Sequence, residues 1–199
     1  MSDVSAKRRV EAILDIAAGL FARHGFRKTS VADIIRGAGV ARATVYKYFS
    51  TKEDIFHAVI RREMQDMLYR VREEVEKEST ARDRLRAAVL THTAEIRKKV
   101  NVYRVTTEVL SDVIPRSEKE VERLVEEALG VYAWILTEGV KAGEVVVDDV
   151  ETTAWSIVLA FKGIFMMTAT GQIEERMPGV IDTLLDIIWN GLKPREEAA

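Results

Sequence analysis

The sequence predicts an all-α fold in two parts, a three-helix helix-turn-helix domain over residues 1–51 and a helical domain over residues 52–199. Apolar residues recur at helical spacing through both parts. The 199 residues include only three prolines, and only 145–147 have the texture of a strand. Residues 1–50 hold nine Lys or Arg and four Asp or Glu, although the whole chain carries a charge of −2. A polyanion is therefore expected to bind the first part.

The first helix is predicted by apolar residues spaced three and four apart. Its inward side comprises Val10, Ile13, Leu14, Ala17, Leu20 and Phe21. Gly25 follows His24 and ends the helix, because glycine readily adopts the left-handed backbone of a helix stop. This helix is the third one that a small helix-turn-helix domain needs to enclose a core.

Two short amphipathic helices follow, joined by a turn at Gly39, where a left-handed backbone suits glycine. Ser30 and Asp33 have the spacing of a capping box at the start of the first of them. The second covers residues 42–49. The apolar residues turned inward are Val31, Ile34 and Ile35 in the first helix and Val45 and Phe49 in the second.

The outward side of the second short helix carries hydrogen-bond donors. They are Arg42, Thr44, Tyr46, Lys47 and Tyr48. Phosphate oxygens and base edges accept hydrogen bonds from such groups, and Arg42 and Lys47 carry the best donors for the major groove. The pattern predicts a DNA-binding domain. An ordinary pair of surface helices is the alternative, and the helix before the pair and the cap after it favour DNA binding.

A long helix over residues 52–78 is predicted to connect the two parts. A capping box at Ser50 through Glu53 starts it, and a length of about 40 Å follows from the helical rise. Its apolar stripe comprises Phe56, Ile60, Met64, Met67, Val71 and Val75. Residues 78–80 form a hinge, and Thr80 with Asp83 caps the next helix. Further helices are predicted over 81–97, 101–113, 117–143, 148–171 and 178–192.

The last two helices are apolar over more than one face. Such a helix is buried on two sides, and a second copy of the chain would close a four-helix bundle with two-fold symmetry. The predicted contacts of this homodimer are Trp155, Phe161, Ile181, Leu184 and Ile188. The symmetry would present two reading helices to major grooves about 34–36 Å apart. A core helix enclosed within a monomer is the alternative.

Polar and aromatic side chains within apolar stripes predict a pocket for a small hydrophobic effector. The candidate contacts are His92, Tyr103, Thr106, Trp134 and Phe165. Three of them have a plainer interpretation as well. His92 fits a hydrogen-bonded core histidine, Thr106 fits a bond to its own helix, and Phe165 fits ordinary packing. Trp134 lies off the main apolar stripe of its helix.

Residues 9–58 resemble the TetR (tetracycline-repressor-like) transcriptional regulators. The resemblance covers about a quarter of the chain, and the remainder matches only in length and helical texture. It is carried by Ala17–Phe26, Thr29–Val31, Ile34–Val40 and Thr44–Glu53. It implies a homodimeric repressor that binds a palindromic double-stranded DNA operator and releases it when a small molecule binds. It also implies phosphate contacts by Tyr46 and Lys52, with Thr29, Ser30 and Tyr48 as further candidates.

Enzymatic and membrane classes find little support. The chain has no cysteine, its three histidines lie on different predicted helices, and no phosphate loop or nucleophile elbow is present, so neither catalysis nor a cofactor is expected. No signal peptide is evident, and the most apolar stretch, 155–170, contains Lys162 and is too short to span a bilayer. A cytoplasmic protein is expected. The alternative function is a non-catalytic ligand-binding or protein-partnered regulator without a small-molecule inducer.

Overall fold

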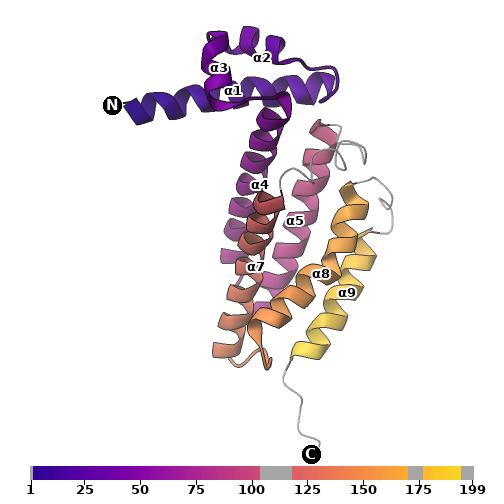
Figure 1. The fold of residues 1–199 in the computed structure, drawn as a ribbon. Helices are drawn as coiled ribbons and strands as arrows, with labels where there is room; N and C mark the ends of the chain where they lie inside the picture. Colours follow the sequence, from indigo (N-terminus) through magenta and orange to yellow (C-terminus); the bar gives the residue numbers. More distant parts are fainter. Residues whose placement is uncertain (1, 104–117, 170–176, 194–199) are drawn as a thin grey trace, which may run out of the picture. The chain divides into compact units, whose positions relative to one another are not determined.

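The computed structural model describes residues 2–103, 118–169 and 177–193, and this part of the chain contains helices and no strand. The all-α prediction is therefore confirmed. The helices are α1 (Ser2–His24), α2 (Val31–Ala38), α3 (Arg42–Tyr48), α4 (Lys52–Glu76), α5 (Ala81–Tyr103), α7 (Glu118–Lys141), α8 (Val150–Ala169) and α9 (Met177–Leu192) (Figure 1). Two compact units form, one of residues 1–64 with 99–120 and one of 65–98 with 121–199.

The core of the first unit joins α1, α2 and α3 to the first turns of α4. It comprises Ile13, Leu14, Ala17, Phe21, Ile34, Val45, Phe49, Ile55, Phe56 and Val59. The Phe56 ring lies edge-on to Phe21, with 5.1 Å between the ring centroids, and 4.8 Å from the centroid of Phe26. Because Ile55, Phe56 and Val59 belong to this core, the compact unit continues past residue 51.

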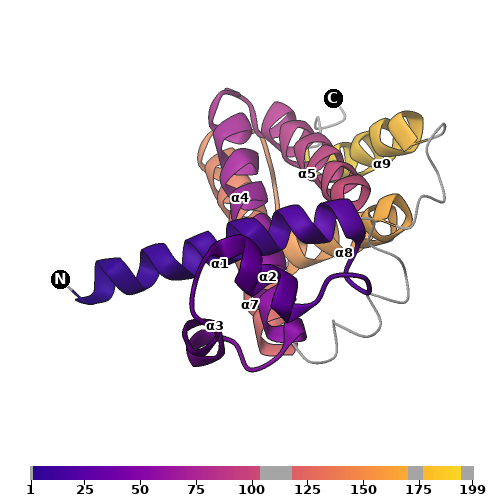
Figure 2. The same ribbon diagram turned by 90° about the horizontal axis from the view of Figure 1, so that it is seen from above.

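Two glycines with a left-handed backbone end α1 and α2. Gly25 has φ 79° directly after α1, and Gly39 ends α2 with φ 62° and ψ 27°, so both predicted stops are confirmed. A Cβ on Gly37 would lie 2.6 Å from Cγ2 of Ile16. Glycine at this position therefore lets α2 pack closely on α1, and Figure 2 shows α1 with α2 and α3 from above.

Capping boxes start α2 and α4. The predicted box at Ser30 and Asp33 is present. The box predicted for Ser50 through Glu53 lies one residue later, because the Thr51 hydroxyl accepts from the Asp54 N–H at 3.1 Å. The Asp54 carboxylate accepts in turn from the N–H groups of Ser50 and Thr51, at 3.0 and 2.9 Å. Ser50 with Glu53 and Thr51 with Asp54 both have the spacing of a capping box, and the backbone after α3 places the second pair at the start of α4.

The second unit encloses a larger apolar core among α5, α7, α8, α9 and the second half of α4. Its buried residues include Val71, Val75, Leu85, Val89, Tyr132, Ile135, Leu136, Ile157, Phe161 and Ile181. Helices α8 and α9 contact one another (Figure 1). The predicted cap at Thr80 and Asp83 is confirmed by the Asp83 N–H, which donates to the Thr80 hydroxyl at 3.1 Å.

Candidate functional site

Helix α3 has one apolar side and one polar side. Val45 is fully buried and Phe49 is 9% exposed, whereas Arg42, Tyr46 and Lys47 are exposed. Thr44 and Tyr48 are half-buried. Burial of the apolar side aims the remaining donors of α3 at solvent, as the sequence predicted.

Aromatic rings support the two cations of α3. The guanidinium carbon of Arg42 lies 5.3 Å from the Tyr46 ring centroid, and the Lys47 ammonium lies 5.7 Å from that of Tyr48. Such contacts restrict the flexible side chains while leaving their N–H groups available. The arrangement is suited to hydrogen bonding with base edges and phosphates.

Thr29 and Ser30 both form hydrogen bonds within the helix-turn-helix. The burial of Thr29 corrects its assignment to a DNA contact, whereas Ser30 is exposed and its predicted contact remains a prediction. The Thr29 side chain is buried, and its hydroxyl donates to the Gly25 carbonyl at 2.9 Å. The Ser30 hydroxyl donates to the Asp33 carboxylate at 2.5 Å and accepts from the Asp33 N–H at 3.2 Å. The Ser30 hydroxyl, together with the Ser30 N–H that donates to the same carboxylate at 3.1 Å, lowers the pKa of Asp33. Sequence resemblance alone did not distinguish such internal bonds from phosphate contacts.

Lys52 is held at the start of α4 by the loop that precedes α2. Its ammonium donates to the Phe26 carbonyl at 2.9 Å and lies 4.2 Å from the centroid of the Phe26 ring. An ammonium group has three donors, so two remain for a phosphate. Lys52 is therefore a positioned charge, and its predicted phosphate contact remains a prediction.

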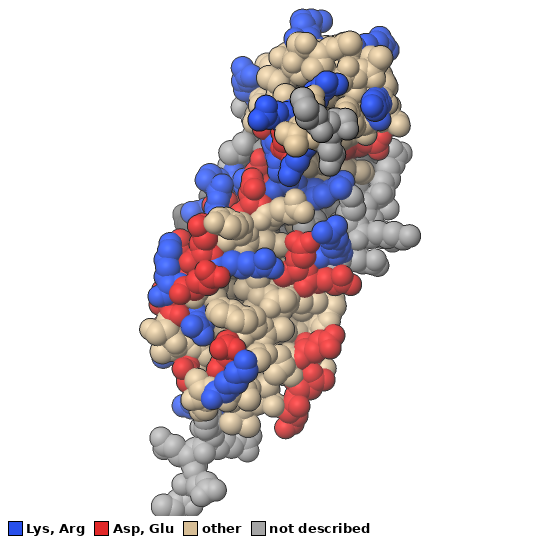
Figure 3. Space-filling model, turned by 90° about the vertical axis from the view of Figure 1, so that its left-hand side faces the viewer, with Lys and Arg blue, Asp and Glu red and all other residues tan. Residues whose placement is uncertain are grey.

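The charges of the first unit support binding of a polyanion. On the face in Figure 3, the charged side chains over α1 to α3 are mainly Lys and Arg. The surface of the second unit on this face carries both signs of charge. The predicted basic character of the first part is thus visible on this face, whereas the second unit shows both signs of charge there.

Three buried polar side chains lie in α5 and α7 of the second unit. His92 is 8% exposed and Tyr132 is 1% exposed, while the buried Thr93 hydroxyl donates to the Val89 carbonyl at 2.8 Å. The Tyr132 hydroxyl has no hydrogen-bond partner among the described residues, and burial raises its pKa. Tyr132 is not among the residues predicted from sequence, although its spacing from Leu129 and Leu136 places a phenol on an apolar stripe.

The other predicted effector contacts differ in outcome. Trp134 is 40% exposed, and the Arg84 guanidinium lies 5.0 Å from its ring centroid. Trp134 therefore lies at the surface of the protomer, off the main apolar stripe of its helix as the sequence indicated. The side chains of Tyr103, Thr106 and Phe165 lie outside the described residues.

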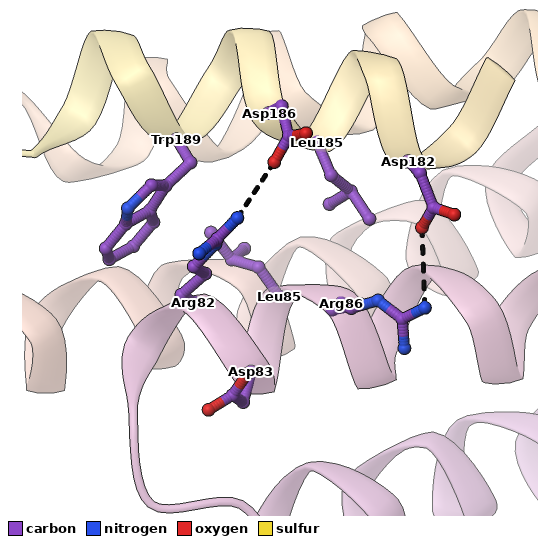
Figure 4. A pocket seen from close by; sticks show the side chains of 8 residues that line it. All are labelled: Arg82, Asp83, Leu85, Arg86, Asp182, Leu185, Asp186 and Trp189. Carbon is purple, nitrogen blue, oxygen red and sulfur yellow. Dashed lines mark hydrogen bonds and ion pairs between the residues drawn. The ribbon is translucent and has the colours of Figure 1, made fainter. Parts of the chain in front are cut away.

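A groove between α5 and α9 is a different feature (Figure 4). Arg82 bonds to Asp186 at 2.9 Å and Arg86 lies 3.4 Å from Asp182, so both cations of the groove are already paired. Its volume is about 290 Å³, at the lower limit for ligand pockets. We interpret it as a surface groove crossed by exposed ion pairs between α5 and α9.

Helices α8 and α9 expose a different set of apolar residues from the one predicted for a dimer contact. Phe161 and Ile181 belong to the core of their own protomer, with 0% and 2% exposure, which corrects their assignment to a dimer contact. Leu184 and Ile188 are half-buried. Among the described residues, the large apolar side chains of α8 and α9 that are exposed are Trp155, Leu159, Val180 and Ile187. The pattern of an all-round apolar helix could not show which side faced inward.

Burial of His92 predicts a pH-dependent stability. Desolvation lowers the pKa of His92 from 6.5 to about 4, so the unfolded chain binds a proton at this residue below pH 6.5 before the folded chain does. Stability is therefore full above pH 6.5 and falls as the pH drops toward 4. Between pH 7 and pH 5 we expect this residue to lower the free energy of unfolding by about 2 kcal/mol.

Urea unfolding of wild type and His92→Leu at both pH values measures this change. The variant lacks the titrating group. Between pH 7 and pH 5, its free energy of unfolding is therefore expected to fall by about 2 kcal/mol less than that of wild type. Equal falls in the two proteins would show that His92 is not buried in its neutral form.

No helix among the described residues is long and apolar enough to cross a membrane. The same residues contain no group of three side chains able to hold a metal ion.

Comparisons with known proteins agree with this architecture. A family model described as "Bacterial regulatory proteins, tetR family" matches residues 13–59, and one described as "Tetracyclin repressor-like, C-terminal domain" matches residues 78–166. The two together cover well over half of the chain.

Individual relatives match in both parts. The HTH-type transcriptional repressor KstR2 of Rhodococcus jostii is 29% identical over 92% of this chain and 94% of its own. The fatty acid metabolism regulator protein of Bacillus subtilis is 29% identical over 67% and 69%. The crystal structure of FadR from Bacillus subtilis in complex with stearoyl-CoA superposes with a TM-score of 0.67 at 22% identity, over 91% of this chain and 98% of that one. The chain therefore belongs to the TetR family of bacterial regulatory proteins, and it is a DNA-binding transcriptional regulator rather than an enzyme.

Proposed function

We propose that the protein is a repressor that binds a palindromic operator as a homodimer and releases it when a hydrophobic small molecule binds. The observation that carries the DNA-binding part is α3, whose exposed side presents Arg42, Tyr46 and Lys47 while Val45 anchors the helix. A two-fold dimer would place two such helices in successive major grooves of one operator.

The proposed dimer uses the exposed apolar side chains of α8 and α9. Trp155 is 39% exposed, Leu159 55% and Ile187 64%. Apolar side chains gathered on two contacting helices favour association, because burial removes their surface from water. A second copy of the same face supplies a matching partner under two-fold symmetry.

The proposed effector site lies in the second unit and includes His92 and Tyr132. A buried hydroxyl without a partner is costly in the ligand-free protein, and a ligand with a polar group beside its apolar part would satisfy it. Two matches from Bacillus subtilis point to the chemical class: the fatty acid metabolism regulator protein and the structure of FadR in complex with stearoyl-CoA. A long-chain acyl thioester is therefore the first effector to test. Tyr103, Thr106 and Phe165 remain predicted contacts.

Release of an operator duplex tests this function. The duplex is selected in vitro with the wild-type protein, and binding is measured by fluorescence anisotropy with stearoyl-CoA or with coenzyme A alone. We expect stearoyl-CoA to weaken binding by about 5–150-fold, the range typical of coupled sites, and coenzyme A to have no effect. Failure of stearoyl-CoA to change binding would reject this long-chain acyl thioester as the effector.

Tyr132→Phe localises the effector site. The substitution removes only a hydroxyl that has no partner among the described residues, so the ligand-free protein is expected to be as stable as wild type or more stable. Effector affinity is expected to fall by about 2–13-fold, the equivalent of one hydrogen bond. Trp134→Ala is the matched control and is expected to keep the full response. The reverse pattern would place the ligand at the surface near Trp134.

A further inference from the structure

The first half of α1 carries basic side chains that the function described above does not use. Lys7, Arg8 and Arg9 are all exposed. Among the described residues, none of the three forms an ion pair with a carboxylate. By contrast, Glu11 and Asp15 farther along the same helix both pair with Arg62. Among the described residues, no ion pair neutralises the positive charge of these three side chains.

A shallow groove joins this part of α1 to the helix-turn-helix. It is lined by Val4, Ser5, Arg8, Arg9 and Ala12 of α1 and by Val40. Val40 immediately precedes Ala41, the N-cap of α3. Because the groove includes the residue next to the start of α3, Arg8 and Arg9 lie beside the N-terminal end of that helix, and Figure 2 shows α1 passing it.

The N-terminal end of α3 is the end that approaches DNA. In helix-turn-helix domains the first residues of the recognition helix contact base edges in the major groove. The phosphates of the strands that border this groove then lie close to neighbouring parts of the domain. Basic side chains beside the start of α3 are therefore within range of the DNA backbone, which is the polyanion that the domain binds.

The Arg9 side chain is also held in a position that suits phosphate binding. Its Nη2 donates to the Ser5 hydroxyl one turn earlier, at 3.0 Å, so the guanidinium is held along α1 with other donors available. A guanidinium binds phosphate in a bidentate manner. A partly ordered arginine loses less entropy on binding than an unrestrained one.

We propose that Arg8 and Arg9 bind backbone phosphates of the operator, so that the interface of each protomer extends from α3 along the first half of α1. These contacts supply affinity without sequence preference, because phosphates are alike at every position. Base readout remains with α3. The inference rests on DNA binding by the helix-turn-helix and is independent of the effector.

The salt dependence of operator binding tests the contacts. Arg8→Gln/Arg9→Gln removes both charges and keeps hydrogen-bonding side chains. For an operator duplex selected with wild type, we expect the slope of log K against log salt to fall by about 0.9 for each phosphate that the variant no longer neutralises. At 0.15 M salt, binding is expected to weaken by about fivefold for each such phosphate. The sequence selected by the variant in vitro is expected to match that of wild type.

A matched control separates these contacts from a general effect of charge. Arg72→Gln/Arg97→Gln removes two exposed arginines of the second unit and is expected to leave the slope unchanged. Ethylation interference is expected to show phosphates whose modification blocks wild type and not the α1 variant. An unchanged salt slope in a stably folded Arg8→Gln/Arg9→Gln variant would overturn this inference and leave the proposed function intact. An equal fall in the salt slope of the control variant would do the same. Failure of wild type to bind any duplex would overturn it together with the proposed function.

Discussion

Leu159→Glu and Ile187→Glu are each expected to produce a folded monomer that binds the operator about 100-fold more weakly than wild type, or worse. The two side chains are 55% and 64% exposed on α8 and α9, so a single protomer tolerates a carboxylate at either position. In the proposed dimer the same carboxylate would be buried without a partner, at a cost of several kcal/mol. Each 1.4 kcal/mol weakens association about tenfold, and a monomer engages only one half-site.

Analytical ultracentrifugation with operator titration measures both effects. Tyr69→Glu is the control, because Tyr69 is 64% exposed on α4 and receives the same charge; this variant is expected to stay dimeric. Phe161→Glu is expected to behave differently again, since a fully buried side chain cannot become charged without unfolding the second unit. A dimeric Leu159→Glu and a dimeric Ile187→Glu would place the interface elsewhere.

Arg42→Ala is expected to erase base preference at one position of each half-site and to cost about 1–3 kcal/mol there. Arg42 is the first residue of α3, where recognition helices contact base edges. Its guanidinium lies over the Tyr46 ring, which aligns its planar set of donors. Selection of operators in vitro with wild type and variant measures the change in preference.

Arg42→Lys distinguishes base readout from a phosphate contact. Lysine keeps the charge and cannot form the two parallel hydrogen bonds that an arginine makes to guanine. If Arg42 reads a base, this variant loses the preference nearly as fully as Arg42→Ala while the salt slope stays close to that of wild type. If both variants select the operator of wild type, Arg42 does not read a base.

The sequence predicted the helix-turn-helix residue by residue where the signal was local. Gly39 has the left-handed backbone expected of it, and Ser30 forms the expected box with Asp33. The exposure of Arg42 and Lys47 also followed from sequence, because α3 has a single apolar side and its burial determines where the others point. Spacing, capping and glycine conformation act over a few residues, so they can be read without knowledge of the fold.

Contacts between residues far apart in the sequence could not be predicted from local patterns. The Lys52 ammonium bonds to the Phe26 carbonyl and the Thr29 hydroxyl turns inward to Gly25, although both positions fitted phosphate contacts by resemblance. Whether a polar side chain bonds within the protein or reaches a ligand depends on which groups the fold brings near it. Tyr132 shows the same dependence, since only the packed core reveals that its hydroxyl has no partner among the described residues.

By itself, the sequence determined the all-α fold, the turn at Gly39 and the polar side of α3, because each depends on the periodicity or backbone preference of a short segment. The tertiary structure alone decided how α8 and α9 are oriented. Both are apolar around most of their circumference, so several rotations about the helix axis bury similar area. Packing against the core of the protomer selected the side with Phe161 and Ile181 for the interior and left Leu159 and Ile187 exposed.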